Sequence, residues 1–128
     1  RLSVRAETPV LTILKVFLAD QQPAIFVIEN IPVPLIRESF DDAELSRPIF
    51  EFLDNRCHAL VDHIVSEIIP CLAQGEPARL LKTETGQAML NFIEVFYSQS
   101  SEPLAVATVY FREPSIRFHA FRKMSYQT

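Results

Sequence analysis

The sequence predicts an α+β domain, built on a six-stranded antiparallel sheet with short helices on one side. Three observations favour this fold class. The chain has 128 residues, which suits one compact domain. Runs of apolar and β-branched residues follow one another in pairs around short polar loops, as the strands of antiparallel hairpins do. Proline, glycine and aspartate separate these pairs from short segments of helical character.

The first pair of apolar runs covers residues 10–18 and 24–29 and predicts a β-hairpin. The polar loop between the two runs contains no glycine, which a tight turn would favour. We therefore expect a loose loop over residues 19–23.

The middle of the chain predicts helices around one long strand. Residues 34–40 suggest a short helix that ends at an acidic break. Ser46 can cap a second helix, with Pro48 in its first turn, which runs to about residue 55. Residues 59–69 suit a strand that Pro70 would end, and a further helical turn follows over residues 77–81.

The last third predicts a second hairpin over residues 87–98 and 103–112, and then a final strand over residues 115–124. These segments bring the expected number of strands to six.

The two hairpins share a sequence pattern. The segment around Ile13 recurs 79 residues later, so that Lys15 matches Glu94, and Pro23 matches Pro103 at a shift of 80. A duplication would build the sheet from two pseudo-symmetric hairpin halves about a pseudo-twofold axis, with a cleft between the halves. The alternative is that unrelated hairpins simply share a composition.

Charge and composition exclude several classes of function. The net charge of −4 gives the chain no attraction for a phosphate backbone, so any contact with DNA would come from another segment. Cys57 and Cys71 are too few for a disulfide framework, which favours a reducing compartment and a cytoplasmic location. Two glycines allow no glycine-rich phosphate loop, and no nucleophile motif occurs.

The cysteines and histidines match no common zinc spacing, so we expect neither a metal nor a cofactor. His63 and Glu67 would share one face of their strand as a possible acid–base pair, but the sequence does not say which face points inward.

Short motifs along nearly the whole chain resemble those of the UTRA domain. Residues 2–11 resemble its opening L-G-V-x-x-G-x-P-V-L, residues 18–23 its L-A-D-G-x-P loop, and Ile31-Pro32 its x-L-P. Residues 49–53 resemble its L-Y-E-x-L helix, and residues 110–118 are similar to its Y-Y-R-G-D-R-Y-x-F. The motifs occur in the same order as in the family.

This resemblance implies a chorismate-lyase-like fold and a role as the effector-binding domain of a HutC-type regulator in the GntR superfamily. In that family a winged helix-turn-helix precedes the domain, and the regulator is a homodimer. Residues 1–128 would then form one effector-binding and dimerisation domain of a bacterial transcription repressor, and would not be an enzyme. A chorismate-lyase-like enzyme and a module that only dimerises, with a filled pocket, are the alternatives.

The sequence departs from family members that bind phosphorylated sugars. Arginines, a serine, a glutamate and tyrosines contact the sugar phosphate in those proteins. The matching positions here are Lys15, Phe17, Val27, Pro48, Phe50 and Ile116. Buried polar groups need hydrogen-bonding partners, and a pocket as apolar as this one would leave those of a sugar phosphate without them.

Polar residues on the flanking strands complete the predicted ligand-binding site: Glu29, Tyr110 and Arg112. One cation among apolar walls suits an apolar or aromatic effector that carries at most one carboxylate, held by Lys15. Lys15 as a solvated residue at the rim is the competing interpretation.

Overall fold

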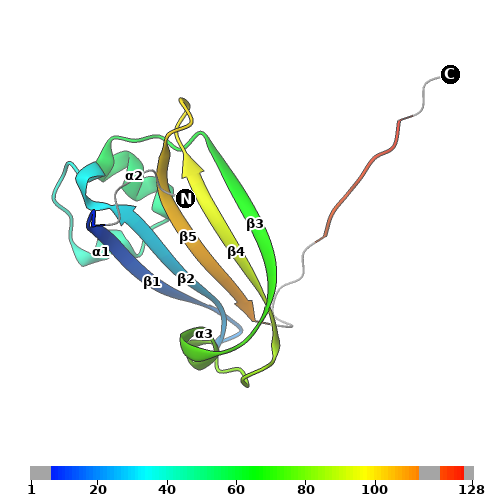
Figure 1. The fold of residues 1–128 in the computed structure, drawn as a ribbon. Helices are drawn as coiled ribbons and strands as arrows, with labels where there is room; N and C mark the ends of the chain where they lie inside the picture. Colours follow the sequence, from blue (N-terminus) through cyan, green and yellow to red (C-terminus); the bar gives the residue numbers. More distant parts are fainter. Residues whose placement is uncertain (1–6, 113–118, 126–128) are drawn as a thin grey trace.

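A computed structural model, which describes residues 7–112 and 119–125, contains one antiparallel sheet of five strands in the order β1-β2-β5-β4-β3 (Figure 1). The strands are β1 (Val10–Ala19), β2 (Gln22–Pro32), β3 (His63–Leu72), β4 (Ala88–Tyr97) and β5 (Pro103–Arg112).

The predicted sixth strand is not found in the described part of the chain. Residues 115–118 of that segment lie outside it, and residues 119–124 are exposed and have no strand structure. Both sides of β5 are already paired, with β2 and β4, so a following segment could join the sheet only at an outer edge. The predicted count of six strands is therefore wrong for the described residues.

The first hairpin is confirmed, but the loose loop predicted for it is wrong. Ala19 pairs with Gln22, and only Asp20 and Gln21 lie between the strands. Both turn residues have positive φ, 50° and 65°. The left-handed backbone of a two-residue turn matches the twist of the strands, and aspartate adopts it more readily than most residues do.

The register between β2 and β5 agrees with two pseudo-symmetric hairpin halves. Ile28 pairs with Thr108, the residue 80 positions later in the chain. On either side of this pair, Glu29 pairs with Ala107 and Val27 pairs with Val109. A twofold rotation about the central pair exchanges the two flanking pairs.

The helices begin at other residues than predicted. Only a 3₁₀ turn, Val33–Leu35, forms in the segment 34–40, and the acidic break becomes helix α1 (Asp42–Leu45). The Asp41 carboxylate accepts a hydrogen bond from the backbone N–H of Glu44 at 3.3 Å and so caps α1. Ser46 lies at the other end of this helix, as its C-cap.

Helix α2 (Ile49–Cys57) has Pro48 at its N-cap and no side-chain cap. The predicted helix is thus confirmed, but its Ser46 cap is wrong. Proline is tolerated at the start of a helix because no intrahelical hydrogen bond is lost there.

Strand β3 starts at His63, not at residue 59, and continues through Pro70 to Leu72. Among the described strands, β3 lies at the edge of the sheet and has β4 as its one neighbour, so the missing N–H of a proline can face the other side.

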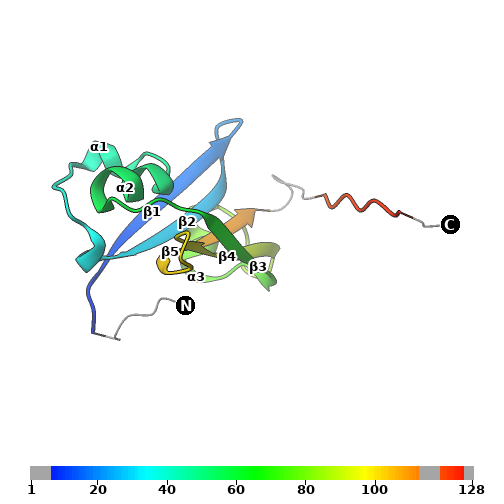
Figure 2. The ribbon, with the colours of Figure 1, turned by 90° about the horizontal axis from the view of Figure 1, so that it is seen from above.

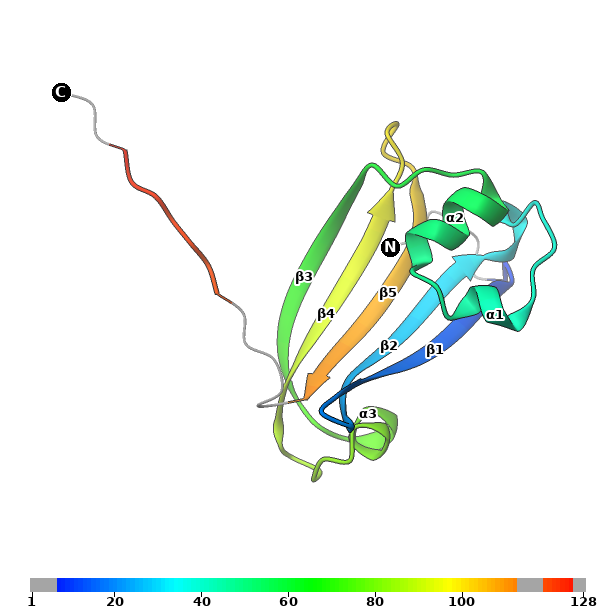
Figure 3. The same cartoon turned by 180° about the vertical axis from the view of Figure 1, so that it is seen from behind.

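The sheet has one apolar core on each face, because successive side chains of a strand point to opposite sides. Helices α1 and α2 lie on one face (Figures 2 and 3), where Ile31, Phe52 and Leu53 are buried. Helix α3 (Gly75–Leu80) lies on the other face, where Leu81 packs with Phe26.

The prediction that the helices share one side is therefore wrong. Strands β2, β4 and β5 also place apolar side chains on the second face of the sheet. Helix α3 and the turn that follows it cover one end of that face. Within the described residues, no helix has the length and apolar character needed to cross a membrane.

Leu81→Ala should lower the free energy of unfolding by about 2–5 kcal/mol, because the Leu81 side chain is 0% exposed in the smaller core. Leu72→Ala is the matched control: Leu72 is 65% exposed, so its loss should change stability by less than about 0.5 kcal/mol. Urea denaturation measures both. Equal effects of the two substitutions would contradict this assignment of the second core.

Candidate functional site

A cavity of about 320 Å³ lies on the face of the sheet that carries α2, next to the first residue of that helix. Strands β1, β2, β4 and β5 each contribute side chains from the same face. The lining residues are Phe17, Ile25, Val27, Glu29, Ile49, Glu94, Phe96, Ala107, Val109 and Phe111. Eight of these ten residues are apolar, and the other two are glutamates.

Glu29 is the buried charged residue of the cavity, with 6% of its surface exposed. Lys15 Nζ lies 2.9 Å from Glu29 Oε1, and the two side chains are 10% and 8% exposed. This contact is a close ion pair, and Lys15 acts on Glu29 both through its charge and as a hydrogen-bonding group. Burial raises the pKa of Glu29, and the neighbouring Lys15 opposes that rise.

The ammonium group of Lys15 already has two partners in the protein. Besides the ion pair with Glu29, its ammonium group donates a hydrogen bond to the Arg47 carbonyl oxygen at 2.8 Å. This bond ties β1 to the loop between α1 and α2. The interpretation of Lys15 as a solvated rim residue does not fit its burial, and its charge is largely neutralised by Glu29.

The second carboxylate belongs to Glu94 on β4. Ala107 on β5 pairs with Glu29 on one side and with Glu94 on the other, so both glutamates point to the same face. Glu94 Oε2 accepts a hydrogen bond from Ser66 Oγ at 3.2 Å. Among the described residues, no lysine, arginine or histidine lies within ion-pair distance of Glu94.

The structure brings part of the predicted site together. Phe17, Val27 and Glu29 line the cavity, and Lys15 contacts Glu29 but is not itself a lining residue. Pro48 directly precedes the lining residue of α2.

Phe50 does not join this cavity. It is 55% exposed and lines a separate groove with Leu60 and His63.

Tyr110 and Arg112 lie on the opposite face of the sheet. The Tyr110 ring stacks on Phe26 with ring centroids 6.0 Å apart, and burial raises the pKa of Tyr110. Arg112 donates a hydrogen bond to the Pro23 carbonyl oxygen at 3.4 Å. Ile116, the last predicted site residue, lies outside the described residues.

Sequence reasoning missed Glu94, although a signal for it existed. Lys15 matches Glu94 in the pattern shared by the two hairpins, and Lys15 is one of the residues of the predicted site. Side chains alternate along β5, so either Tyr110 or Phe111 faces the cavity, and the structure shows that it is Phe111. The sequence alone did not specify which face of β5 points inward.

The cysteines and histidines remain apart. Cys57 is buried at the end of α2, whereas Cys71 lies on β3, and burial raises the pKa of both thiols. His58 is the C-cap of α2 and lies 2.7 Å from the carboxylate of Glu38. Within the described ranges, no three histidine, cysteine or acidic side chains form a cluster that could hold a metal.

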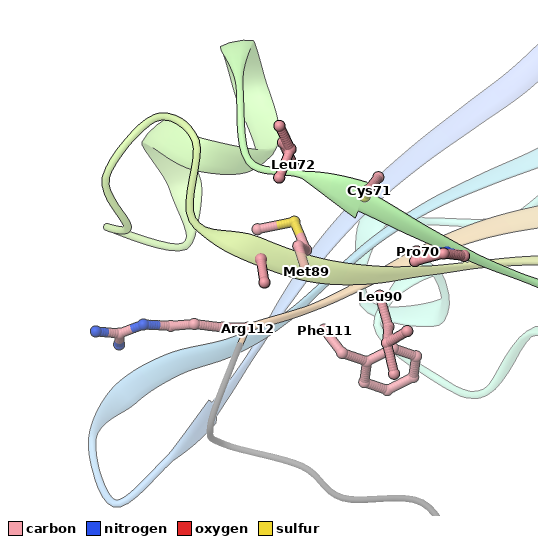
Figure 4. Close-up of a pocket in the computed structure, with 8 residues that line it drawn as sticks. Pro70, Cys71, Leu72, Met89, Leu90, Phe111 and Arg112 are labelled. Atoms are coloured by element: carbon pink, nitrogen blue, oxygen red, sulfur yellow. The ribbon is translucent and has the colours of Figure 1, made fainter.

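A second cavity, of about 450 Å³, lies at the open end of β3, β4 and β5 (Figure 4). Cys71 and Met89 line it from one face of the sheet, and Leu90 and Phe111 from the other. The Arg112 side chain extends away from these residues. Unlike the first cavity, this one has no acidic lining residue, so it has fewer polar groups that could fix the orientation of a ligand.

The fold matches those of bacterial regulator domains. The C-terminal domain of YurK from Bacillus subtilis has a TM-score of 0.82 at 17% identity, with 92% of this chain and 81% of that chain covered. A GntR-family transcriptional regulator from Enterococcus faecalis has a TM-score of 0.82 at 20% identity, covering 94% and 86%. The effector domain of PhnF from Mycobacterium smegmatis has a TM-score of 0.80 at 21% identity, covering 96% and 75%.

The sequence profile of the UTRA domain matches residues 1–117. The chain belongs to the UTRA domain family. No curated protein matches the sequence.

Lys15→Met should destabilise the domain by about 3–5 kcal/mol, because it leaves the Glu29 carboxylate buried without a partner. Combining it with Glu29→Leu removes both charges, and this double variant should lie within about 1 kcal/mol of the wild type or above it. Urea denaturation at about pH 7 measures both effects.

The pH dependence provides a further check. Without Lys15, the folded-state pKa of Glu29 rises further, so the lost stability should return as the pH falls through that pKa and the carboxyl becomes neutral. A double variant as unstable as Lys15→Met alone would contradict the ion pair.

Proposed function

We propose that this chain is the effector-binding domain of a HutC-type transcription repressor in the GntR superfamily. The observation that carries the proposal is the cavity beside α2, which is apolar except for the carboxylates on its floor. Membership of the UTRA family and a fold shared with regulator effector domains support it. In this proposal a winged helix-turn-helix outside this chain binds DNA, and an effector in the cavity changes that binding.

We propose that the effector is mainly apolar or aromatic and carries at most one carboxylate. The rings of Phe17, Phe96 and Phe111 and the side chain of Val27 form much of the lining. Among the described lining residues there is no arginine to bind a phosphate group. Because Lys15 is paired with Glu29, a ligand carboxylate would have to compete with Glu29 for it.

The cavity also favours effector binding over a module that only dimerises. A domain with a filled pocket would have apolar side chains in this space, whereas a volume of about 320 Å³ lies at the small end of the range for ligand sites.

Phe17→Arg should weaken the binding of aromatic ligands at least about tenfold, because it removes an apolar wall and brings a cation to the cavity. Phe50→Arg is the matched control: both rings are about half exposed (48% and 55%), but Phe50 lines another groove. A thermal-shift screen with aromatic acids, urocanate, medium-chain fatty acids and a hexosamine phosphate measures the effect. A large shift from the hexosamine phosphate that Phe17→Arg leaves intact would place the site elsewhere.

We further propose that the domain forms a homodimer. The outer strands leave large apolar side chains exposed, among them Val16 (41%) on β1 and Val65 (55%) on β3. Exposed apolar surface and open strand edges are typical of a surface that another chain covers. Sedimentation at micromolar concentration should therefore give twice the chain mass, and a monomer over the whole range would contradict this proposal.

A further inference from the structure

The floor of the cavity beside α2 carries more negative than positive charge. Glu29 and Glu94 flank Ala107 on the same face of the sheet. Lys15 is the single basic residue that the described part of the chain places in contact with either carboxylate. Arg47, which follows α1, instead pairs with Glu51 at 2.8 Å and is largely exposed. One carboxylate is therefore in excess.

The Oε1 atom of Glu29 can accept a further hydrogen bond. It is buried, the Lys15 ammonium lies 2.9 Å from it, and its residue lines the cavity with 6% of its surface exposed. A carboxylate oxygen has lone pairs for more than one donor, so the contact with Lys15 leaves capacity for a donor on a ligand. Hydrogen bonds to an ionised carboxylate are stronger than those between neutral groups.

The apolar walls suit a cation as well. Phe17, Phe96 and Phe111 line the same space, and the faces of aromatic rings attract cations.

The start of α2 offsets part of the negative charge of the two glutamates, because the N-terminal end of a helix carries about half a positive charge. Ile49, the first residue of α2, does line the cavity. Together with Lys15, this end still supplies less positive charge than Glu29 and Glu94 supply negative charge. This balance disfavours an anionic ligand.

We propose that the effector is an apolar or aromatic molecule with one protonated amine, which lies between Glu94 and Oε1 of Glu29. This inference rests on the proposed function, since it names the ligand class for the same cavity. Glu94 supplies the unpaired charge, and Glu29 accepts a hydrogen bond from the amine.

Three probes with one carbon skeleton test the proposal: 3-phenylpropylamine, 3-phenylpropionate and 3-phenylpropanol. Titration of the ¹⁵N-labelled domain, followed by amide chemical shifts, measures weak binding and locates it. The amine should bind at least about tenfold more tightly than the acid, with the largest shifts around Glu94 and Ala107. The alcohol should lie between the two.

Glu94→Gln keeps the shape of the side chain and removes its charge. It should weaken the amine about tenfold and leave the alcohol unchanged. Glu84→Gln is the control, because Glu84 is exposed in the turn before β4 and should have no effect on either ligand. The amide spectrum of each variant shows whether it is folded. If Glu94→Gln does not fold, the wild-type comparison of amine with acid decides.

The outcomes separate the two proposals. If the acid binds as tightly as the amine, or if a folded Glu94→Gln binds the amine like the wild type, the amine proposal fails. The effector-binding function stands in either case, because the cavity still takes a ligand. If none of the three probes shifts the amides of the cavity, both proposals are contradicted.

Discussion

Strand β2 pairs with β5 at the centre of the sheet, and the remaining elements depend on this pairing. It joins the β1–β2 hairpin to the β3–β4–β5 part of the sheet, and each of these parts alone would leave a large apolar face open to water. Phe26 and Ile31 on β2 and Ala105 on β5 are completely buried, and they serve cores on both faces. Helices α2 and α3 then cover surfaces that the central pair has already assembled.

The same pairing determines the chemistry of the cavity. In the observed register, Val27, Glu29, Ala107 and Val109 face α2 together. Because side chains alternate along a strand, a slip of one residue in β2 would replace Glu29 with Ile28 or Asn30 on that face. The carboxylate of β2 would then leave the cavity, and Lys15 would lose its partner. The strand register that builds the sheet therefore also determines which charged side chains face the cavity.

The sequence predicted the strands of both hairpins well, because their apolar runs are long and their loops are short and polar. Features that depend on tertiary context were predicted less well. The tight turn at Asp20 and Gln21 lacks glycine, and β3 accommodates Pro70 as an edge strand of the described sheet. The side of the sheet on which α3 packs depends on which face Phe26 occupies, and no local pattern specifies that.

The predicted site shows the same limit. The residues taken from β1 and β2 lie together on one face, since one strand register relates Phe17, Lys15 and Val27 to one another. Tyr110 lies on the face opposite the cavity, because alternation gives two sets of residues and the sequence does not say which set points inward. The position of Glu94 follows from its match with Lys15, but only if the shared pattern is taken as a symmetry of the structure.

That symmetry gives the cavity a direction. Lys15 and Glu94 occupy corresponding positions on the two outer strands of the paired hairpins, each next to a central strand, and their charges are opposite. A frame with twofold symmetry would accept a small molecule equally well in two orientations, related by half a turn. Exchanging an ammonium group for a carboxylate at one of the two equivalent positions removes this equivalence. A molecule with two unlike ends therefore meets a polarised space and can be held in a single orientation.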